Sequence, residues 1–177
     1  MRTLLRFSFA MLIAIALFSC SKDDGDSTPS ATEGQLTAEI NGSNTTFQVY
    51  ATKVVTEEDG TVIYIFGTST DGQKSFALWV LANSVTARTY PIPSYSEGYE
   101  YDTQTGYGMG MYWEGTAQTV DEEWVSFEIE GSSGSITITD ISNTNVKGTF
   151  DLTMVNLGNQ TSTMDFNGSF NANFLTY

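Results

Sequence analysis

The chain contains no histidine, a single cysteine, three prolines and only seven lysines and arginines. Without histidine, a Ser-His-Asp triad, a Cys-His pair, a histidine-ligated zinc site and a histidine pH switch are excluded. The seven cations stand against 21 aspartates and glutamates, which gives a formal charge of -14. This charge repels phosphate backbones, so we expect no nucleic-acid partner. Any chemistry must rest on carboxylates, hydroxyls or tyrosines.

The N-terminus has the layout of an export signal. Arg2 and Arg6 flank a short basic start, and an apolar run extends from Phe7 to Phe18. A helix that spans a bilayer needs about 20 apolar residues, so this shorter run predicts a cleaved signal peptide at residues 1–19. The lone cysteine, Cys20, follows Leu17-Phe18-Ser19, which resembles the lipobox of bacterial lipoproteins. That resemblance implies cleavage before Cys20 and acylation of its thiol.

Residues 20–34 are small, polar and acidic. The sequence Ser21-Lys22-Asp23-Asp24-Gly25-Asp26 resembles the export signal of Bacteroidetes-type lipoproteins, which implies a lipid-anchored position on the outer membrane, facing the cell exterior. We expect the lipidated Cys20 and a flexible linker with an average reach of roughly 20 Å. Loss of the signal would remove two arginines and shift the formal charge from -14 to -16. Asp26-Ser27-Thr28 resembles an O-glycosylation tripeptide, and an unmodified linker is the alternative.

From residue 35 onward, apolar and polar residues alternate in short runs separated by turn residues. A period of two is typical of strands, and Asn41-Gly42 favours a tight hairpin turn. We therefore predict one all-β domain over residues 35–177, an antiparallel sandwich or a partly closed barrel of about 8–10 strands. Expected strands lie at 36–40, 46–55, 61–68, 75–82, 107–113, 124–130, 135–141, 149–154 and 166–174.

Three of these strands carry unusual faces. Residues 61–68 and 75–82 are apolar on both alternations, so we expect them to be central and covered on both sides. In 107–113, large side chains alternate with glycines. This pattern favours a strand whose large side chains face the core and whose glycines lie on the reverse side. The large residues are Tyr107, Met109, Met111 and Trp113, and the glycines are Gly106, Gly108 and Gly110.

Motifs near the C-terminus resemble a known family. They are an alternating Ile and Thr run from Gly134 to Thr139, the sequence Val146-Lys147-Gly148-Thr149-Phe150, and Gly168-Ser169-Phe170. Together with the acidic, lipidated start, they are similar to a family of small Bacteroidetes surface lipoproteins with a C-terminal β domain of unknown function. The opening hairpin, with Phe47, is similar too. The resemblance implies a fold and a location, and it implies no activity.

The middle of the chain, residues 90–113, interleaves tyrosines with carboxylates. Pyranose rings stack on Tyr or Trp while carboxylates accept hydrogen bonds from the sugar hydroxyls, so this segment suggests a glycan-binding module. Packing in the core and loops is the alternative, and burial of nearly all these aromatics would remove the motive for the glycan hypothesis. The candidate ligand-binding residues are Tyr95, Tyr99, Tyr101, Trp113, Glu100 and Asp102.

Carboxylates offer two less favoured hypotheses. Glu97, Glu100, Asp102 and Glu114 could supply the acid and the second carboxylate of a glycosidase, but acidic loop residues are usually only solvated. The oxygen-rich segments 57–60 and 121–123 could hold Ca²⁺, which takes six to eight oxygen ligands. Neither segment fits the loop pattern D-x-[DN]-x-[DN]-G, so we expect solvated hairpin turns, no metal site and no cofactor.

These observations favour a non-catalytic envelope lipoprotein, a binding or structural module, over an enzyme. The expected partners are the outer membrane, through acylated Cys20, and a glycan or another envelope protein. A subunit of a larger surface assembly would show an exposed apolar patch or an unpaired edge strand. A glycan-binding module would show its aromatic side chains on one exposed face.

Overall fold

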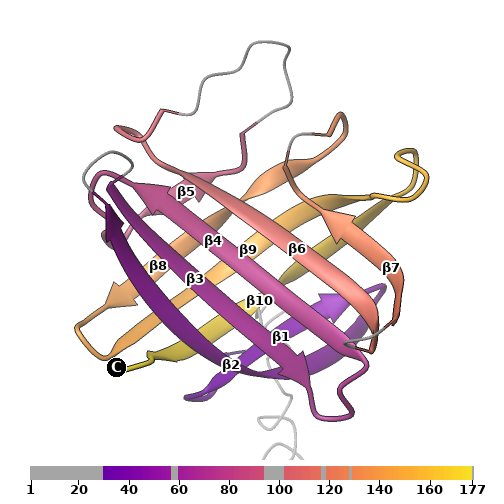
Figure 1. Cartoon of the computed structure of the whole chain (residues 1–177), viewed down its shortest axis with the longest axis horizontal. Coiled ribbons are helices and arrows are strands. Elements are labelled where there is room, and N and C mark those ends of the chain that lie inside the picture. Colours follow the sequence, from indigo (N-terminus) through magenta and orange to yellow (C-terminus); the bar gives the residue numbers. More distant parts are fainter. Residues whose placement is uncertain (1–29, 57–59, 94–101, 117–118, 128, 177) are drawn as a thin grey trace, which may run out of the picture.

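Ten strands build the part of the chain that the computed structural model describes, which is residues 30–56, 60–93, 102–116, 119–127 and 129–176 (Figure 1). The predicted all-β class and strand count are confirmed. No helix in these ranges is long and apolar enough to cross a membrane. The strands are β1 (Gln35–Ile40), β2 (Ser43–Thr56), β3 (Gly60–Ser69), β4 (Lys74–Ala82), β5 (Thr89–Pro91), β6 (Tyr107–Thr116), β7 (Thr119–Val125), β8 (Ser133–Ile141), β9 (Asn145–Asn156) and β10 (Thr163–Phe174).

Eight strands close into an antiparallel barrel in the order β1, β2, β3, β4, β6, β7, β9 and β10, and β10 returns to β1. The sequence left a sandwich or a partly closed barrel open, and the structure resolves this choice in favour of a closed barrel. Closure depends on β7, which pairs with β6 along most of its length and with β9 at only two positions. The extra strands β8 and β5 extend from the same edge of β9.

The first hairpin confirms the turn predicted from Asn41-Gly42. Both residues have positive φ, 51° and 74°, as a two-residue turn of the primed type requires. The turn sets Ile40 opposite Ser43, and this register continues to Leu36 opposite Phe47. Leu36, Ala38 and Ile40 consequently all point into the barrel, where they are buried.

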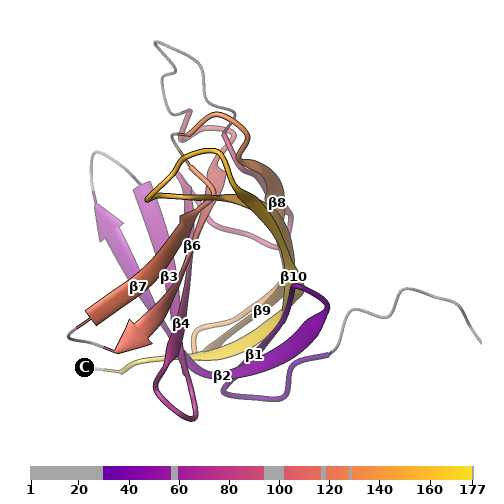
Figure 2. The same cartoon turned by 90° about the vertical axis from the view of Figure 1, so that its right-hand side faces the viewer.

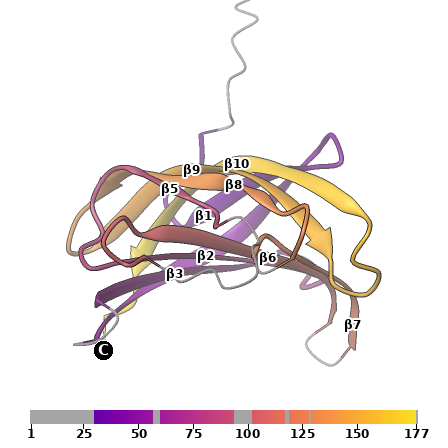
Figure 3. The ribbon, with the colours of Figure 1, turned by 90° about the horizontal axis from the view of Figure 1, so that it is seen from above.

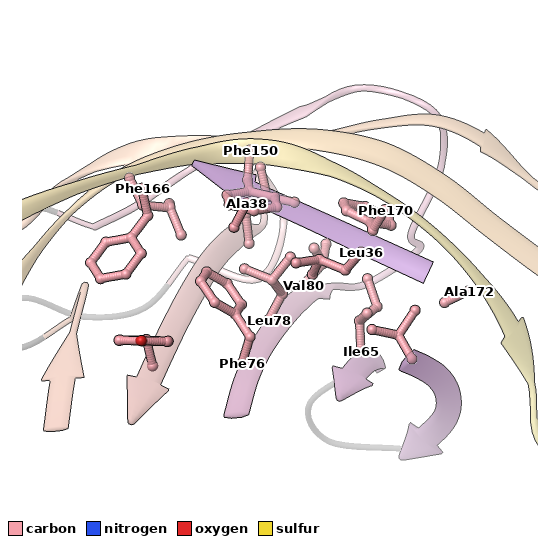
Figure 4. Close-up of a cluster of buried hydrophobic side chains, with 14 of the residues drawn as sticks. Leu36, Ala38, Ile65, Phe76, Leu78, Val80, Phe150, Phe166, Phe170 and Ala172 are labelled. Carbon is pink, nitrogen blue, oxygen red and sulfur yellow. The ribbon is translucent and has the colours of Figure 1, made fainter. Parts of the chain in front are cut away.

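Apolar side chains from both sides of the barrel fill its interior (Figure 4). Phe76 on β4 lies at the centre, and its ring centroid is 5.1 Å from that of Phe150 on β9 and 5.8 Å from that of Phe166 on β10. Tyr112 on β6 lies 5.0 Å from Phe166. These contacts join distant strands, so the aromatic cluster holds the two sides of the barrel together.

The two C-terminal motifs interlock inside this core. In the β9–β10 register, Phe150 lies opposite Gly168 and Phe170 lies opposite Gly148. A Cβ atom on Gly168 would come within 2.7 Å of the Phe150 ring, and one on Gly148 within 2.5 Å of the Phe170 ring. Each phenylalanine therefore packs over the glycine of the other motif, which explains why the pattern needs glycine at both positions.

Strand β6 corrects the prediction about its faces. Tyr112, Gly108 and Gly110 face the barrel interior, while Met109, Met111 and Trp113 face outward and are half-buried. The reason is space, because Ile136 and Leu152 from the opposite side reach the β6 backbone. A Cβ atom on Gly110 would lie 2.6 Å from Leu152 Cδ1, and one on Gly108 would lie 3.0 Å from Ile136 Cδ1.

Other local predictions also need correction. The strand expected at 124–130 is β7, which begins and ends earlier, so the acidic residues 121–123 lie in a strand and not in a turn. The short β5 was not predicted. Strands β3 and β4 are not covered on both sides, because Tyr64 is exposed and Phe66 and Trp79 are half-buried on their outer faces. In contrast, β9 and β10 have the one wet face that their alternation predicts.

Candidate binding surface

The barrel presents two opposite outer walls, which lie on different sides in Figures 2 and 3. One wall is formed by β2, β3, β4 and β6, and because side chains alternate along a strand, its outward residues are those between the core positions. We call this surface the aromatic wall. It comprises Tyr50, Val54, Tyr64, Phe66, Trp79, Leu81, Met109, Met111 and Trp113, with Phe127 against Trp79.

Two rows of rings cross the aromatic wall. In the first row, the Tyr50 and Phe66 centroids are 5.6 Å apart, and those of Phe66 and Trp113 are 5.8 Å apart. In the second row, Trp79 lies 6.1 Å from Tyr64 and 6.4 Å from Phe127, in edge-to-face contact with both. Each row links residues from three separate chain segments, so the rings support one another across the strands.

Several large side chains of this wall reach solvent. The exposed fractions are 41% for Tyr50, 39% for Tyr64 and 45% for Val54. Among the described side chains of these four strands, none that alternation directs outward is charged. The nearest carboxylate in register is Glu123 on β7, opposite Trp113. A strongly acidic protein thus keeps one extended face neutral and apolar, which is unusual for a monomer surface.

The outer face of β1, β8, β9 and β10, the polar wall, has a different composition. Its side chains form hydrogen bonds with one another, including Thr153 Oγ1 to Asp165 Oδ1 at 2.8 Å and Asn145 Nδ2 to Asn171 Oδ1 at 2.8 Å. Both charge signs occur here. The wall comprises Gln35, Thr37, Glu39, Ser135, Thr137, Asn145, Lys147, Thr149, Asp151, Thr153, Asp165, Asn167, Ser169, Asn171 and Asn173.

The first described residues lie against the polar wall (Figure 2). The Ala31 amide donates to Ser169 Oγ at 2.8 Å, and the Gly34 amide donates to the Asn171 carbonyl at 2.8 Å. Both partners belong to β10. The chain therefore enters the barrel on the side opposite the aromatic wall.

The predicted site residues do not form one described site. Cys20, Tyr95, Tyr99, Tyr101 and Glu100 lie outside the described residues. Trp113 belongs to the aromatic wall, as described above.

Asp102 lies apart from Trp113, in the turn before β6. It accepts hydrogen bonds from the Thr105 hydroxyl and the Gln104 amide, and these bonds hold its carboxyl pKa below the usual value. Both carboxylate oxygens are used within the turn, so Asp102 serves its own loop.

Other tyrosines of segment 90–113 are packing residues, as the alternative proposed. Tyr90 is fully buried, its hydroxyl bonds the backbone of Thr86, and the Arg88 guanidinium lies 4.6 Å from its ring centre. Tyr107 is only 8% exposed. The glycan hypothesis in its original form therefore loses these aromatics, while Trp113 joins a surface made by other strands.

Tyr112 connects the core to a polar cluster at one end of the barrel. Its hydroxyl donates to Glu114 Oε1, and Lys74 Nζ lies 3.6 Å from the same oxygen. Burial raises the pKa of the Tyr112 phenol well above its usual value, and the neighbouring Glu114 adds to this shift. The phenol thus stays protonated and acts as a fixed hydrogen-bond donor, and Glu114 serves as a structural carboxylate.

The two described glycosidase candidates are far apart. Asp102 precedes β6 and Glu114 lies near its end, and Tyr107 to Glu114 alone span about 23 Å of strand. Paired glycosidase carboxyls lie roughly 5–9.5 Å from each other. Asp102 and Glu114 therefore cannot form such a pair, and Glu97 and Glu100 lie outside the described residues.

The acidic residues of β7 line a shallow groove of about 570 Å³, together with the turn between β9 and β10. The Trp124 indole donates to Glu122, and Glu123 lies on the other face of the strand, in register with Trp113. Among the described residues, no group of three or more His, Cys, Asp or Glu could hold a metal ion. The oxygen-rich segment 57–59 lies outside these residues.

Sequence reasoning missed most of the aromatic wall, although a signal was present. Strands 61–68 and 75–82 are apolar on both alternations, a pattern that predicts coverage on both faces. The second apolar face is instead the partly exposed one, with Tyr64, Phe66 and Trp79. Their partner on β2, Tyr50, could be recognised only once the register was known.

In comparisons with known proteins, no family model, no curated protein and no solved structure matches this chain. The similarity to small surface lipoproteins therefore rests on the sequence motifs alone. Any function must be argued from the surface itself.

Proposed function

We propose that this chain is a lipid-anchored, non-catalytic lipoprotein of the bacterial outer membrane that displays its barrel to the cell exterior as a binding module. The lipobox-like sequence before Cys20 and the acidic residues after it support the anchor and the direction of export. The aromatic wall supports the binding role. Cys20 attaches the module to the membrane, and the barrel meets the ligand.

The observation that carries the binding role is the contrast between a filled interior and an apolar exterior. Phe76, Phe150 and Phe166 occupy the middle of the barrel, in the place where other barrels hold a ligand. Tyr50, Tyr64 and Val54 are exposed on a neutral face, at a cost in solubility that a purely structural barrel would avoid. The outer face is thus where this barrel binds.

The anchor is tested by expressing the full chain and a Cys20→Ala variant in a bacterium of the same envelope type. Metabolic labelling with radioactive palmitate should mark the full chain and leave Cys20→Ala unlabelled. Ser21→Ala is the matched control, because it keeps the thiol and should stay labelled. Equal labelling of Cys20→Ala and the full chain would overturn the anchor.

The direction of export is tested by protease treatment of intact cells. The full chain should be digested from outside, whereas joint substitution of Asp23, Asp24 and Asp26 by Asn should leave a labelled but protected protein. A full chain that survives on intact cells and is digested only after lysis would overturn the surface location. If substitution of the exposed rings of the aromatic wall leaves ligand binding unchanged, the binding role is overturned.

A further inference from the structure

We propose that the aromatic wall is a docking surface for a neutral polysaccharide that approaches from outside the cell. This inference deepens the proposed function and rests on it for the direction of approach. The ligand class follows from the charge and the chemistry of the wall, which are properties of the barrel alone.

The direction follows from where the described chain begins. Ser30 is ten residues from Cys20 in the sequence, a length that spans at most about 35 Å when fully extended. Ala31 and Gly34 are bonded to β10 on the polar wall. The chain therefore enters the barrel through the polar wall, on the side opposite the aromatic wall (Figure 3).

This placement bears on two other occupants. A lipid surface on the aromatic wall would have to meet the side of the barrel opposite the point where the chain enters. A second copy of the chain on this wall would form a dimer, which the sedimentation experiment below detects. A ligand from the medium or from a neighbouring cell reaches the wall directly.

Charge selects a neutral ligand. The chain carries a formal charge of -14, so an anionic polymer is repelled at long range. A cationic ligand would need carboxylates on the wall. None of the outward described side chains of β2, β3, β4 and β6 provides one, and Glu123 lies only at its edge, opposite Trp113. A protein partner of complementary charge would likewise find no charged groups on these strands with which to fix its register.

The side chains suit sugar rings in particular. The exposed rings of Tyr50 and Tyr64 are diagonal neighbours on adjacent strands, because Tyr50 lies opposite Phe66 and Thr52 lies opposite Tyr64. The apolar faces of pyranose rings stack on such side chains. Gln48, Thr52 and Thr68 add uncharged amide and hydroxyl groups beside the rings, which can exchange hydrogen bonds with sugar hydroxyls.

The first experiment is affinity electrophoresis of the full chain in detergent, in gels that contain one polysaccharide each. The neutral probes are a soluble β-glucan, an α-glucan, a xylan and a galactomannan, and the anionic probe is alginate. We expect at least one neutral probe to retard the protein and alginate to leave it unretarded. A protein that no neutral probe retards, or that alginate retards equally, would overturn the proposal.

Variants assign the binding to the wall. The double variant Tyr50→Ala with Tyr64→Ala should weaken retardation at least about tenfold, because it removes both exposed rings. Tyr50→Phe with Tyr64→Phe keeps the rings and should change it by about twofold or less. Asn167→Ala with Thr149→Ala, on the polar wall, is the matched control and should bind normally. Equal binding by the alanine pair and the full chain would contradict the assignment.

Intrinsic fluorescence gives a second readout. Trp79 and Trp113 lie on the wall, whereas Trp124 is only 6% exposed and belongs to the core. Ligand binding should change the emission of a Trp124→Phe protein, and the Trp79→Phe, Trp113→Phe pair should lose that change. Sedimentation analysis of the same samples checks for self-association. A dimer that dissociates in the Tyr50→Ala, Tyr64→Ala variant would overturn the polysaccharide in favour of a second copy.

These results are separable from those on the proposed function. Palmitate labelling and surface digestion test the anchor without any polysaccharide. If the chain is labelled and exposed on cells but no neutral probe binds, this inference fails and the anchored lipoprotein stands. If the probes bind but Cys20 is not acylated, the ligand class stands and the direction of approach fails.

Discussion

The aromatic wall and the polar wall are built from neighbouring strands of one barrel, and their inner faces contribute to the same core. Their outer faces differ. On the polar wall, Asn, Thr, Asp and Lys side chains bond one another, as in Thr153 with Asp165. On the aromatic wall, the Phe66 ring contacts both Tyr50 and Trp113, and all three residues remain partly open to water.

The polar wall packs with only its inner face apolar, so one apolar face per strand is sufficient there. On β3 and β4 the outer face is apolar as well: Val62 and Ala77 are buried in it, whereas Tyr64 is exposed. Since such a face risks aggregation, a binding role gives a reason for its presence.

Among substitutions that test this comparison, replacement of a core ring should cause the largest loss in the free energy of unfolding. Phe76→Ala removes a fully buried side chain that contacts Phe150 and Phe166, and we expect a loss of about 4 kcal/mol in the free energy of unfolding. Tyr64→Ala, on the outer face of the adjacent strand, should cost less than about 1.5 kcal/mol. Urea unfolding followed by fluorescence measures both. Similar losses would mean that the outer ring belongs to the core.

A methyl group added inside each wall should have the next largest effect. A Cβ atom on Gly168 would lie 2.0 Å from the Thr37 carbonyl oxygen, which is backbone and cannot yield easily. We expect Gly168→Ala to cost about 3 kcal/mol. Gly110→Ala meets the side-chain ends of Leu152 and Met154, and should cost about 1 kcal/mol. Thermal unfolding of the two variants compares them, and a reversed order would contradict this account of the glycines.

We expect ionisation of the Tyr112 phenol to lower the stability of the protein at alkaline pH. Its folded pKa lies above the value of 10.0 for an unperturbed tyrosine, so the folded state holds this proton more tightly than the unfolded state. Its contribution is present below pH 10 and is lost as the pH rises beyond that value. At pH 8, Tyr112→Phe should lower the free energy of unfolding by about 1 kcal/mol, because the variant lacks the hydrogen bond to Glu114. Between pH 9 and 11, the melting temperature of the variant should fall less than that of the unsubstituted protein. An identical fall in both proteins would exclude Tyr112 as the cause.

Conversion of the aromatic wall toward the polar wall should have the smallest effect on stability. Tyr50→Lys with Tyr64→Lys replaces two exposed rings, and we expect each change to shift the free energy of unfolding by no more than about 0.5 kcal/mol. Binding of the dye ANS to the folded protein should nevertheless decrease, because the dye needs an open apolar surface. Asn167→Lys on the polar wall should leave dye binding unchanged. Undiminished dye binding by the lysine pair would place the open apolar surface elsewhere.

The predictable parts of this fold are those that depend on local pattern. The Asn41-Gly42 turn, the all-β class and the single wet faces of β9 and β10 follow from residue type and alternation. The faces of β6 did not follow, because alternation separates Met109 and Met111 from Gly108 and Gly110 without saying which set is inside. That choice depends on Ile136 and Leu152, which come from strands later in the chain.

The candidate site was less predictable than the fold. Of the proposed ligand residues, Trp113 is the one that the structure places on the aromatic wall. Tyr50, Phe66 and Trp79 are each far from Trp113 in the sequence, and their contacts depend on the order of β2, β3, β4 and β6. Of the other proposed ligand residues, Asp102 bonds within its own turn, and Tyr95, Tyr99, Glu100 and Tyr101 lie outside the described residues.

By itself, the sequence determined the strands' alternation, the first hairpin, the excess of negative charge and the absence of histidine chemistry. Only the tertiary structure decided that the strands close into a barrel through β7, that glycines face inward on β6, and that rings from separate strands form one neutral wall. The physical reason is that a period of two divides each strand into two faces. Which face becomes the core depends on the volumes that meet across the barrel, and those belong to residues far apart in the chain.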